Sequence, residues 1–176
     1  TVNGAGSSGF QKIVYGAGSA VAVDASGKKF ASQNSQPWNQ VGGITSTALG
    51  YRGDLGFLAA GGISPIYANP QLSSDGLNWD TLAPLNDDLG ISDLQGVSYG
   101  PLGFFLSGLN RYWVSTDGVN WTARPTTGRN GSFSLVKYLG GLYYQVGSLG
   151  DSMLKVSTNG FDYSTRFFLP LGGQLA

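Results

Sequence analysis

Short stretches of alternating apolar and polar residues recur along the chain and predict many short β-strands. Four of them end at a tyrosine that is followed closely by glycine, at residues 13–16, 49–53, 97–100 and 136–140. A second apolar stretch follows each one, at 20–23, 57–60, 104–107 and 142–146. A tight glycine turn between two such stretches is typical of a β-hairpin. In each unit a third strand runs into a serine and, after a turn, a fourth begins at an aromatic residue.

The turn before each fourth strand has a repeated sequence. The segments are Ser-Ser-Asp-Gly-Leu-Asn-Trp at 73–79, Ser-Thr-Asp-Gly-Val-Asn-Trp at 115–121, Ser-Thr-Asn-Gly-Phe-Asp-Tyr at 157–163 and the divergent Ser-Gln-Asn-Ser-Gln-Pro-Trp at 32–38. Their leading serines are separated by 41, 42 and 42 residues. Such self-similarity over the whole chain predicts one structural unit repeated four times.

The residues of this motif have a structural rationale. Asp or Asn followed by Gly supplies a side-chain oxygen that caps the turn and a residue that is free to take a positive φ. The serine hydroxyl can close the same turn, and the aromatic residue then packs back on the sheet. We therefore assign a structural role to these positions and expect both tryptophans to be buried: Ser73, Asp75, Gly76, Trp79, Ser115, Asp117, Gly118, Trp121, Ser157, Asn159, Gly160 and Tyr163.

This motif resembles the Asp-box (BNR-like) repeat of sialidases and other β-propellers, in a form one residue shorter between Asp and Trp. The resemblance implies that the motif lies on a peripheral turn between the third and fourth strands, away from any ligand site. Four antiparallel strands in about 42 residues are typical of a propeller blade. The sequence thus predicts an all-β propeller of four blades, either closed by themselves or part of a larger or oligomeric ring. We expect a lead-in at 1–9 and one domain at 10–176, with repeats near 10–44, 45–88, 89–129 and 130–172.

The amino-acid composition excludes several classes of catalytic and metal-binding site. The 176 residues contain 29 Gly, no His, no Cys and no Glu, and ten basic residues balance ten Asp. Without His and Cys there is no zinc finger, no Ser-His triad and no thiol nucleophile. The zero net charge gives no excess of positive charge, which nucleic-acid binding would favour. Abundant Gly and aromatic residues favour short strands over helices, and no apolar run is long enough to span a membrane as a helix. The sequence predicts no cofactor and no metal.

Three motifs have a functional and a structural interpretation. The acidic segment 86–93 holds three carboxylates, which suit Ca²⁺, but its spacing matches no EF-hand and a solvated loop is favoured. Arg52-Gly53-Asp54 is an integrin-type tripeptide within a predicted hairpin turn, where hairpin chemistry is favoured. The third is the Asp-box-like repeat itself, which resembles that of sialidases. In those enzymes a Tyr nucleophile is assisted by a Glu, and this chain has no Glu. A pair of Asp residues could still serve a glycosidase, although we expect no catalytic residue.

Candidate binding residues lie outside the repeated positions. Arg111, Tyr112 and Trp113 form an aromatic and basic run in the third strand of the third repeat, and Arg129 lies in a variable loop. Such side chains commonly anchor interfaces, and aromatic faces stack on sugars. Packing between blades is the alternative interpretation of the run. We expect a ligand surface at Trp113 and in the loops 61–71, 86–93 and 124–132.

Propellers of this style are similar to those of bacteriophage tail and fibre proteins and of bacterial surface proteins. The resemblance implies a non-catalytic module on a virion or outside the cell. Its partners would be a host-surface glycan or protein, or other virion proteins, with a homo-oligomer left open. A secreted lectin and an Asp-box glycosidase are the alternatives. Because the net charge is zero, we expect binding through aromatic stacking and hydrogen bonds that varies little with salt.

Overall fold

The protein is an all-β chain. The computed structural model describes residues 9–61, 69–85, 94, 96–108, 111–125, 133–147 and 153–168. Sixteen strands lie in these ranges: β1 (Phe10–Gly16), β2 (Ser19–Asp24), β3 (Lys29–Gln33), β4 (Asn39–Val41), β5 (Ala48–Arg52), β6 (Gly56–Ala60), β7 (Gln71–Ser73), β8 (Asp80–Thr81), β9 (Gly96–Gly100), β10 (Gly103–Gly108), β11 (Arg111–Ser115), β12 (Thr122–Pro125), β13 (Phe133–Leu139), β14 (Leu142–Gly147), β15 (Met153–Ser157) and β16 (Ser164–Phe168).

The strands form four separate antiparallel sheets, each built from four consecutive strands. The first sheet is β1–β4, the second β5–β8, the third β9–β12 and the fourth β13–β16. Within each sheet every strand pairs with the next one along the chain. The predicted fold class, an all-β propeller built from four blade repeats, is therefore confirmed.

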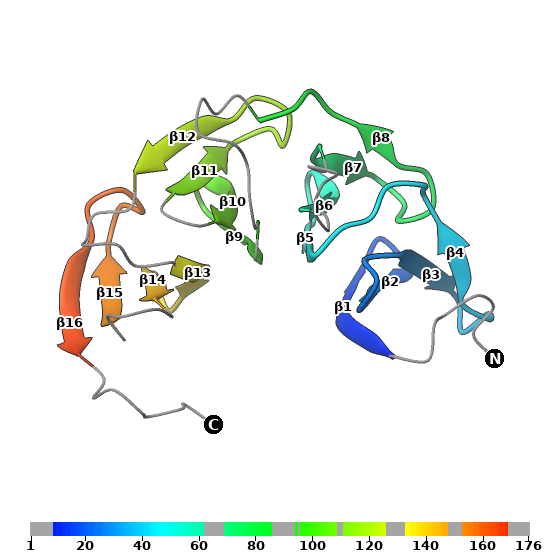
Figure 1. The fold of residues 1–176 in the computed structure, drawn as a ribbon, viewed down its shortest axis with the longest axis horizontal. Helices are drawn as coiled ribbons and strands as arrows, with labels where there is room; N and C mark the ends of the chain where they lie inside the picture. The colour runs from blue at the N-terminus through cyan, green and yellow to red at the C-terminus, as the bar shows by residue number, and fades with distance from the viewer. Residues whose placement is uncertain are drawn as a thin grey trace.

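The four sheets are arranged side by side along an open arc (Figure 1). The first strand of each sheet lies on the inner side of the arc, and the fourth strand lies on the outer side. Neighbouring inner strands contact one another in the order β1, β5, β9 and β13. Among the described residues no comparable contact joins β1 to β13, so the four sheets do not close a ring. Closure of a ring by the four blades alone is therefore not seen in the described part of the chain.

Apolar cores fill the spaces between adjacent sheets. Successive residues of a strand point to opposite faces of its sheet, and both faces of an interior sheet are covered. In the second sheet, for example, Leu49 packs with Val21 of the first sheet, whereas its neighbour Ala48 packs with Phe104 of the third. The third and fourth sheets enclose a core that contains Phe105, Tyr112, Val114, Val136 and Tyr143.

The repeated turns rest on the preceding sheet. A Cβ atom at Gly76 would lie 2.6 Å from Cγ2 of Val21, and one at Gly160 would lie 2.8 Å from Cδ1 of Leu102. Both glycines also have positive φ, 78° and 73°. Each position therefore requires glycine for two reasons: the backbone has positive φ, and the neighbouring sheet leaves no room for a Cβ atom.

Trp79 and Trp121 are half-buried, which is less than the full burial expected from the sequence. Trp79 packs at the edge of the core between the first two sheets, and Trp121 at the edge of the next core. Both follow the repeated turn and are only partly covered.

Candidate functional site

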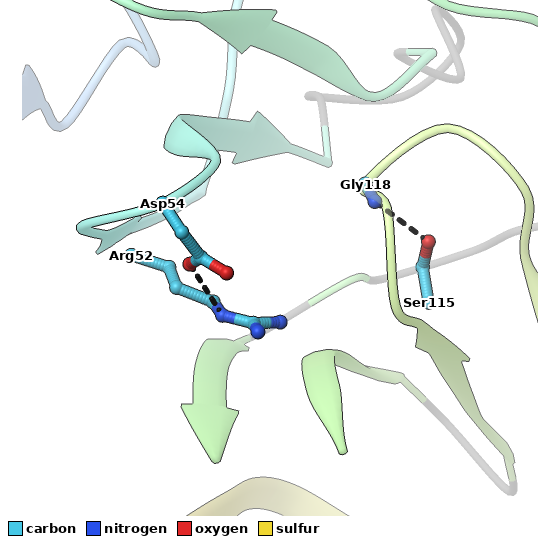
Figure 2. A network of polar contacts seen from close by, with 4 residues as sticks. All are labelled: Arg52, Asp54, Ser115 and Gly118. Carbon is cyan, nitrogen blue, oxygen red and sulfur yellow. Dashed lines mark hydrogen bonds and ion pairs between the residues drawn. The ribbon is translucent and has the colours of Figure 1, made fainter. Parts of the chain in front are cut away.

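The repeated turns have the same hydrogen-bond geometry in the second, third and fourth sheets. Oδ1 of Asp75 accepts hydrogen bonds from the backbone N–H groups of Leu77 and Asn78, both at 2.8 Å. The hydroxyl of Ser73 donates to the same carboxylate and accepts from the backbone N–H of Gly76. The third sheet repeats the pattern with Asp117, and Figure 2 shows its Gly118 N–H donating to the Ser115 hydroxyl. The polar groups of these side chains therefore form hydrogen bonds within their own turns.

The hydrogen bonds control the acidity of the turn carboxylates. They lower the pKa of Asp75 to about 2, chiefly through the N–H of Asn78, and they lower that of Asp117 as well, chiefly through the side chain of Asn120. In the fourth sheet Asn159 takes the place of Asp, and its side-chain oxygen accepts from the N–H groups of Phe161 and Asp162. An acceptor oxygen, with or without charge, is what the turn requires.

The structure does not place Trp113 and Tyr112 on the surface. Trp113 is only 3% exposed and packs in the core between the second and third sheets. Tyr112 points the opposite way, stacks with Phe105, and donates a hydrogen bond from its hydroxyl to the carbonyl oxygen of Gly160 at 3.3 Å. The expectation of an exposed Trp113 is therefore wrong, because both faces of β11 are covered by neighbouring sheets.

The other sequence candidates are placed as follows. Arg111 is half-buried at the start of β11, opposite Pro125. Arg129 and the acidic segment 86–93 lie outside the described residues. Arg52 and Asp54 form an ion pair of 2.7 Å inside the β5–β6 turn, which Figure 2 shows. That tripeptide is thus part of a hairpin turn. In the described part of the chain no group of three acidic, His or Cys residues is placed to hold a metal ion.

A different site lies where the inner strands of all four sheets converge. The tyrosines that end these strands, Tyr15, Tyr51, Tyr99 and Tyr138, line a cavity of about 460 Å³. Val14, Leu49, Val97 and Ser98 complete much of its wall. In the sequence these tyrosines indicate only where the first strand of each repeat ends. Their recurrence at the same position of every repeat was the signal that could have identified the site.

The four tyrosines differ in exposure. Tyr51 packs over Gly16 of the preceding sheet, and its hydroxyl oxygen accepts a hydrogen bond from the N–H of Ala17 at 3.2 Å. Tyr138 lies beside Gly100 through its Cβ and Cγ atoms, and its ring packs on that of Tyr143 with the ring centroids 4.8 Å apart. Tyr15 and Tyr99 are 72% and 54% exposed. The concave face therefore has two tyrosines fixed by packing and two with free ring faces.

Two lysines make this face locally positive. Lys137 of the fourth sheet lines the tyrosine cavity, and Lys12 of the first sheet lies with Lys137 in an adjoining cavity of about 340 Å³. Burial lowers the pKa of Lys12, and the positive charge of Lys137 lowers it further. The Lys12 ammonium donates to the carbonyl oxygen of Thr47 at 2.8 Å. No carboxylate is among the described residues that line the two cavities.

The concave face therefore combines tyrosine side chains with two lysine side chains around the two cavities. Within the described ranges no helix is long and apolar enough to pass through a bilayer.

The fold defines a β-propeller class of protein, and the comparisons agree with it. No family model matches the sequence, and no curated protein matches it. The Asp-box assignment thus stays a resemblance. Among solved structures, the chain is similar to the β-propeller YCF48 in a structure described as "YCF48 bound to D1 peptide", with a TM-score of 0.57 and 14% identity. The match covers 91% of this chain and 52% of that one, so the chain spans about half the length of this neighbour. At this identity the likeness shows the fold alone.

Proposed function

We propose that the chain is a non-catalytic interaction module that binds an extended, acidic polypeptide segment on its concave face. The observation that carries the proposal is the cavity lined by residues of all four sheets, with four tyrosines at equivalent positions and Lys137 at its wall. Tyrosine provides large contact area with little loss of conformational entropy, and lysine selects for carboxylates.

The charge of the site supports an acidic ligand. Lys12 and Lys137 come from the two ends of the arc, and the charge of Lys137 adds to burial in lowering the pKa of Lys12, with no carboxylate among the described residues of the cavity walls to compensate. A ligand carboxylate would relieve this repulsion. The salt-independent binding expected from the net charge is thus replaced by a prediction of salt-sensitive binding. A fold neighbour that was solved with a peptide bound is in keeping with a peptide ligand.

The proposal is tested with an array of extended peptides that differ in Asp and Glu content, beside a glycan array. Lys137→Gln and Tyr99→Ser change exposed side chains of the concave face and should each weaken binding of acidic peptides about tenfold, with unchanged melting temperature. Val119→Ser is the matched control, because Val119 is an exposed apolar residue of an outer turn. Raising salt from 0.05 to about 0.5 M should weaken wild-type binding and hardly affect the Lys137→Gln variant.

Binding that is equal for acidic and neutral peptides, or that Val119→Ser weakens as much as Tyr99→Ser, would contradict the proposal. Selective binding on the glycan array would instead support the lectin alternative. A virion or extracellular location, and a host-surface glycan as ligand, stay predictions from the style of the repeats.

A further inference from the structure

The side of the fourth sheet that faces away from the third carries a cavity that matches one on the third sheet, where the turn of the next sheet forms part of the wall. We define this free side by Leu139, Leu142, Tyr144 and Val156, which alternate with the residues that face the third sheet. Leu139 is 71% exposed. Tyr144 and Val156 are half-buried, whereas Phe105 and Val114, their counterparts on the third sheet, are buried.

The two cavities are matched residue by residue. The cavity of about 290 Å³ on the third sheet and that of about 370 Å³ on the fourth share six positions, each at the same distance in sequence from the turn serine. These are Val114 and Val156, Ser115 and Ser157, Thr116 and Thr158, Asn120 and Asp162, Thr122 and Ser164, and Arg124 and Arg166.

On the third sheet the turn of the next sheet borders this cavity. Phe161, the residue after the turn glycine, lines the cavity, and Cζ of Arg124 lies 5.1 Å from the centre of its ring. Gly160 approaches Leu102 and Phe105 so closely that a Cβ atom would meet both. The element that packs against the third sheet at this cavity is therefore a turn in which a glycine is followed by an apolar residue.

The described part of the chain offers no free turn of this kind for the fourth sheet. The glycine turns of the second, third and fourth sheets are each seated on the sheet before them. The turn of the first sheet has Ser35 at the glycine position, with φ of 61°. Its side chain would occupy the space that the neighbouring sheet needs, so a second copy of the first sheet does not match the cavity.

We propose that the free side of the fourth sheet is a docking site for a further four-stranded repeat, carried by polypeptide other than residues 9–168. Its turn would present a glycine and then an aromatic or apolar side chain, which Arg166 would cover as Arg124 covers Phe161. The contact would continue the interface that joins the four sheets of this chain, and it is separate from the concave face.

The first test extends the protein with a second copy of residues 130–172 placed after residue 172, followed by the native end. The added aromatic ring should give nuclear Overhauser contacts to the methyl groups of Val156, and the urea midpoint should rise above that of the native chain. The same extension with the added glycine changed to Val should lose both effects. A folded extension with no contact to Val156, or one that stabilises equally with Val in place of the glycine, would overturn the proposal.

The second test stays informative if the extension fails to fold. A cyclic peptide with the sequence of residues 157–163 is titrated into the intact isotope-labelled chain. Resonances of Tyr144, Val156 and Thr158 should shift with saturation, and Gly→Val in the peptide should weaken binding at least tenfold. Thr158→Arg, which changes an exposed residue, should block the peptide without changing the melting temperature. Absence of shifts at these residues, or concentration-dependent dimers of the native chain in contact through Val156, would contradict the assigned occupant.

Discussion

The ammonium group of Lys29 lies 5.3 Å from the centre of the Trp79 indole ring, across the boundary between the first and second sheets. Lys29 is fully buried, and its ammonium also donates to the carbonyl oxygen of Ile44 and to Oε1 of Gln71. Cation–π contacts are strongest where water is excluded. Nevertheless, burial lowers the pKa of Lys29 from 10.5 to about 8, because a buried charge loses its hydration.

This burial predicts that stability rises with pH in the alkaline range. Between about pH 8 and 10 the unfolded chain binds the Lys29 proton more tightly than the folded chain does, so raising the pH favours folding. The full effect is roughly 3 kcal/mol, from 1.36 kcal/mol per pKa unit. Urea unfolding at pH 7.5 to 9.5 follows the rise, and Lys29→Met should reduce the slope to the part that Lys12 contributes, because the pKa of Lys12 is lowered too. The window stops near pH 10, because burial raises the pKa of Tyr112 and Tyr143 and loss of their protons then favours unfolding. A flat wild-type profile would refute the assignment.

The turn carboxylates predict that stability also rises with pH in the acid range, between about pH 2 and 4. The folded pKa values of Asp75 and Asp117 lie below the ordinary value of 3.8. Their contribution is therefore complete above about pH 4 and declines as the pH falls toward 2. Denaturant midpoints from pH 5 to 2.5 should decrease, and Asp75→Asn should make the decrease shallower. An unchanged slope in that variant would show that other groups dominate acid unfolding.

Asn159 predicts which substitutions the turns tolerate. Because an amide oxygen replaces the carboxylate in the fourth sheet and accepts the same N–H groups, Asp75→Asn should retain most of the stability at pH 7. Asp75→Ala leaves the N–H groups of Leu77 and Asn78 without their acceptor and should cost about 1–3 kcal/mol. Calorimetry separates the two variants, and equal losses would argue against the acceptor role.

Gly76 and Gly140 form a matched pair for testing the contact between sheets. Both have positive φ, 78° and 57°, but only Gly76 faces a neighbouring side chain, whereas a Cβ at Gly140 meets open space. Gly140→Ala should cost about 1 kcal/mol for the backbone conformation alone. Gly76→Ala adds overpacking against Val21 and should cost about 2–4 kcal/mol in total. Similar losses for the two variants would mean that the first two sheets separate easily to admit the methyl group.

Trp113 is expected to act through stability. Trp113→Ala leaves a cavity between the second and third sheets and should cost about 3–5 kcal/mol. The indole N–H of Trp113 is buried without a hydrogen-bond partner in the described structure. Trp113→Phe, which removes that N–H and keeps most of the ring, should therefore cost much less. A binding defect of Trp113→Phe with wild-type stability would restore the earlier hypothesis of a ligand-contacting residue.

The repeats were predictable from the sequence because each sheet needs the same local chemistry. A tyrosine and glycine end the first strand, and serine, an acceptor side chain and glycine make the outer turn, so their spacing locates four sheets of four strands. The side to which Trp113 points was not predictable. Residues 112 and 113 alternate between two faces that are both covered, and alternation identifies a solvent face only where one face is open.

The concave site was harder to identify for a related reason. Tyr15 and Tyr51 occupy the same position of their repeats, yet one is exposed and the other packs over Gly16. Tyr99 is also 54% exposed although a sheet precedes it, so the exposure of each tyrosine depends on its neighbours in the assembled arc and not on its position in the repeat. Lys12 and Lys137 line one cavity although they are far apart in the sequence, and no local sequence pattern indicates that they lie close together.

The seating of each turn on the sheet before it gives the arc a direction, and the direction determines how the chain should come apart. Sheets that contact only their neighbours behave as a one-dimensional array, in which the end units are each held by one interface. The two ends are unequal here. The first sheet provides the surface on which the turn at Gly76 rests, whereas the fourth sheet contributes its own turn to the third and receives none. Loss of either end sheet uncovers one core, but loss of the fourth leaves the turns of the second and third sheets seated, whereas loss of the first leaves the turn at Gly76 without the surface on which it rests. Partial unfolding should accordingly begin at the fourth sheet and propagate toward the first, and native-state hydrogen exchange would show it as stepwise protection that increases from β16 back to β5.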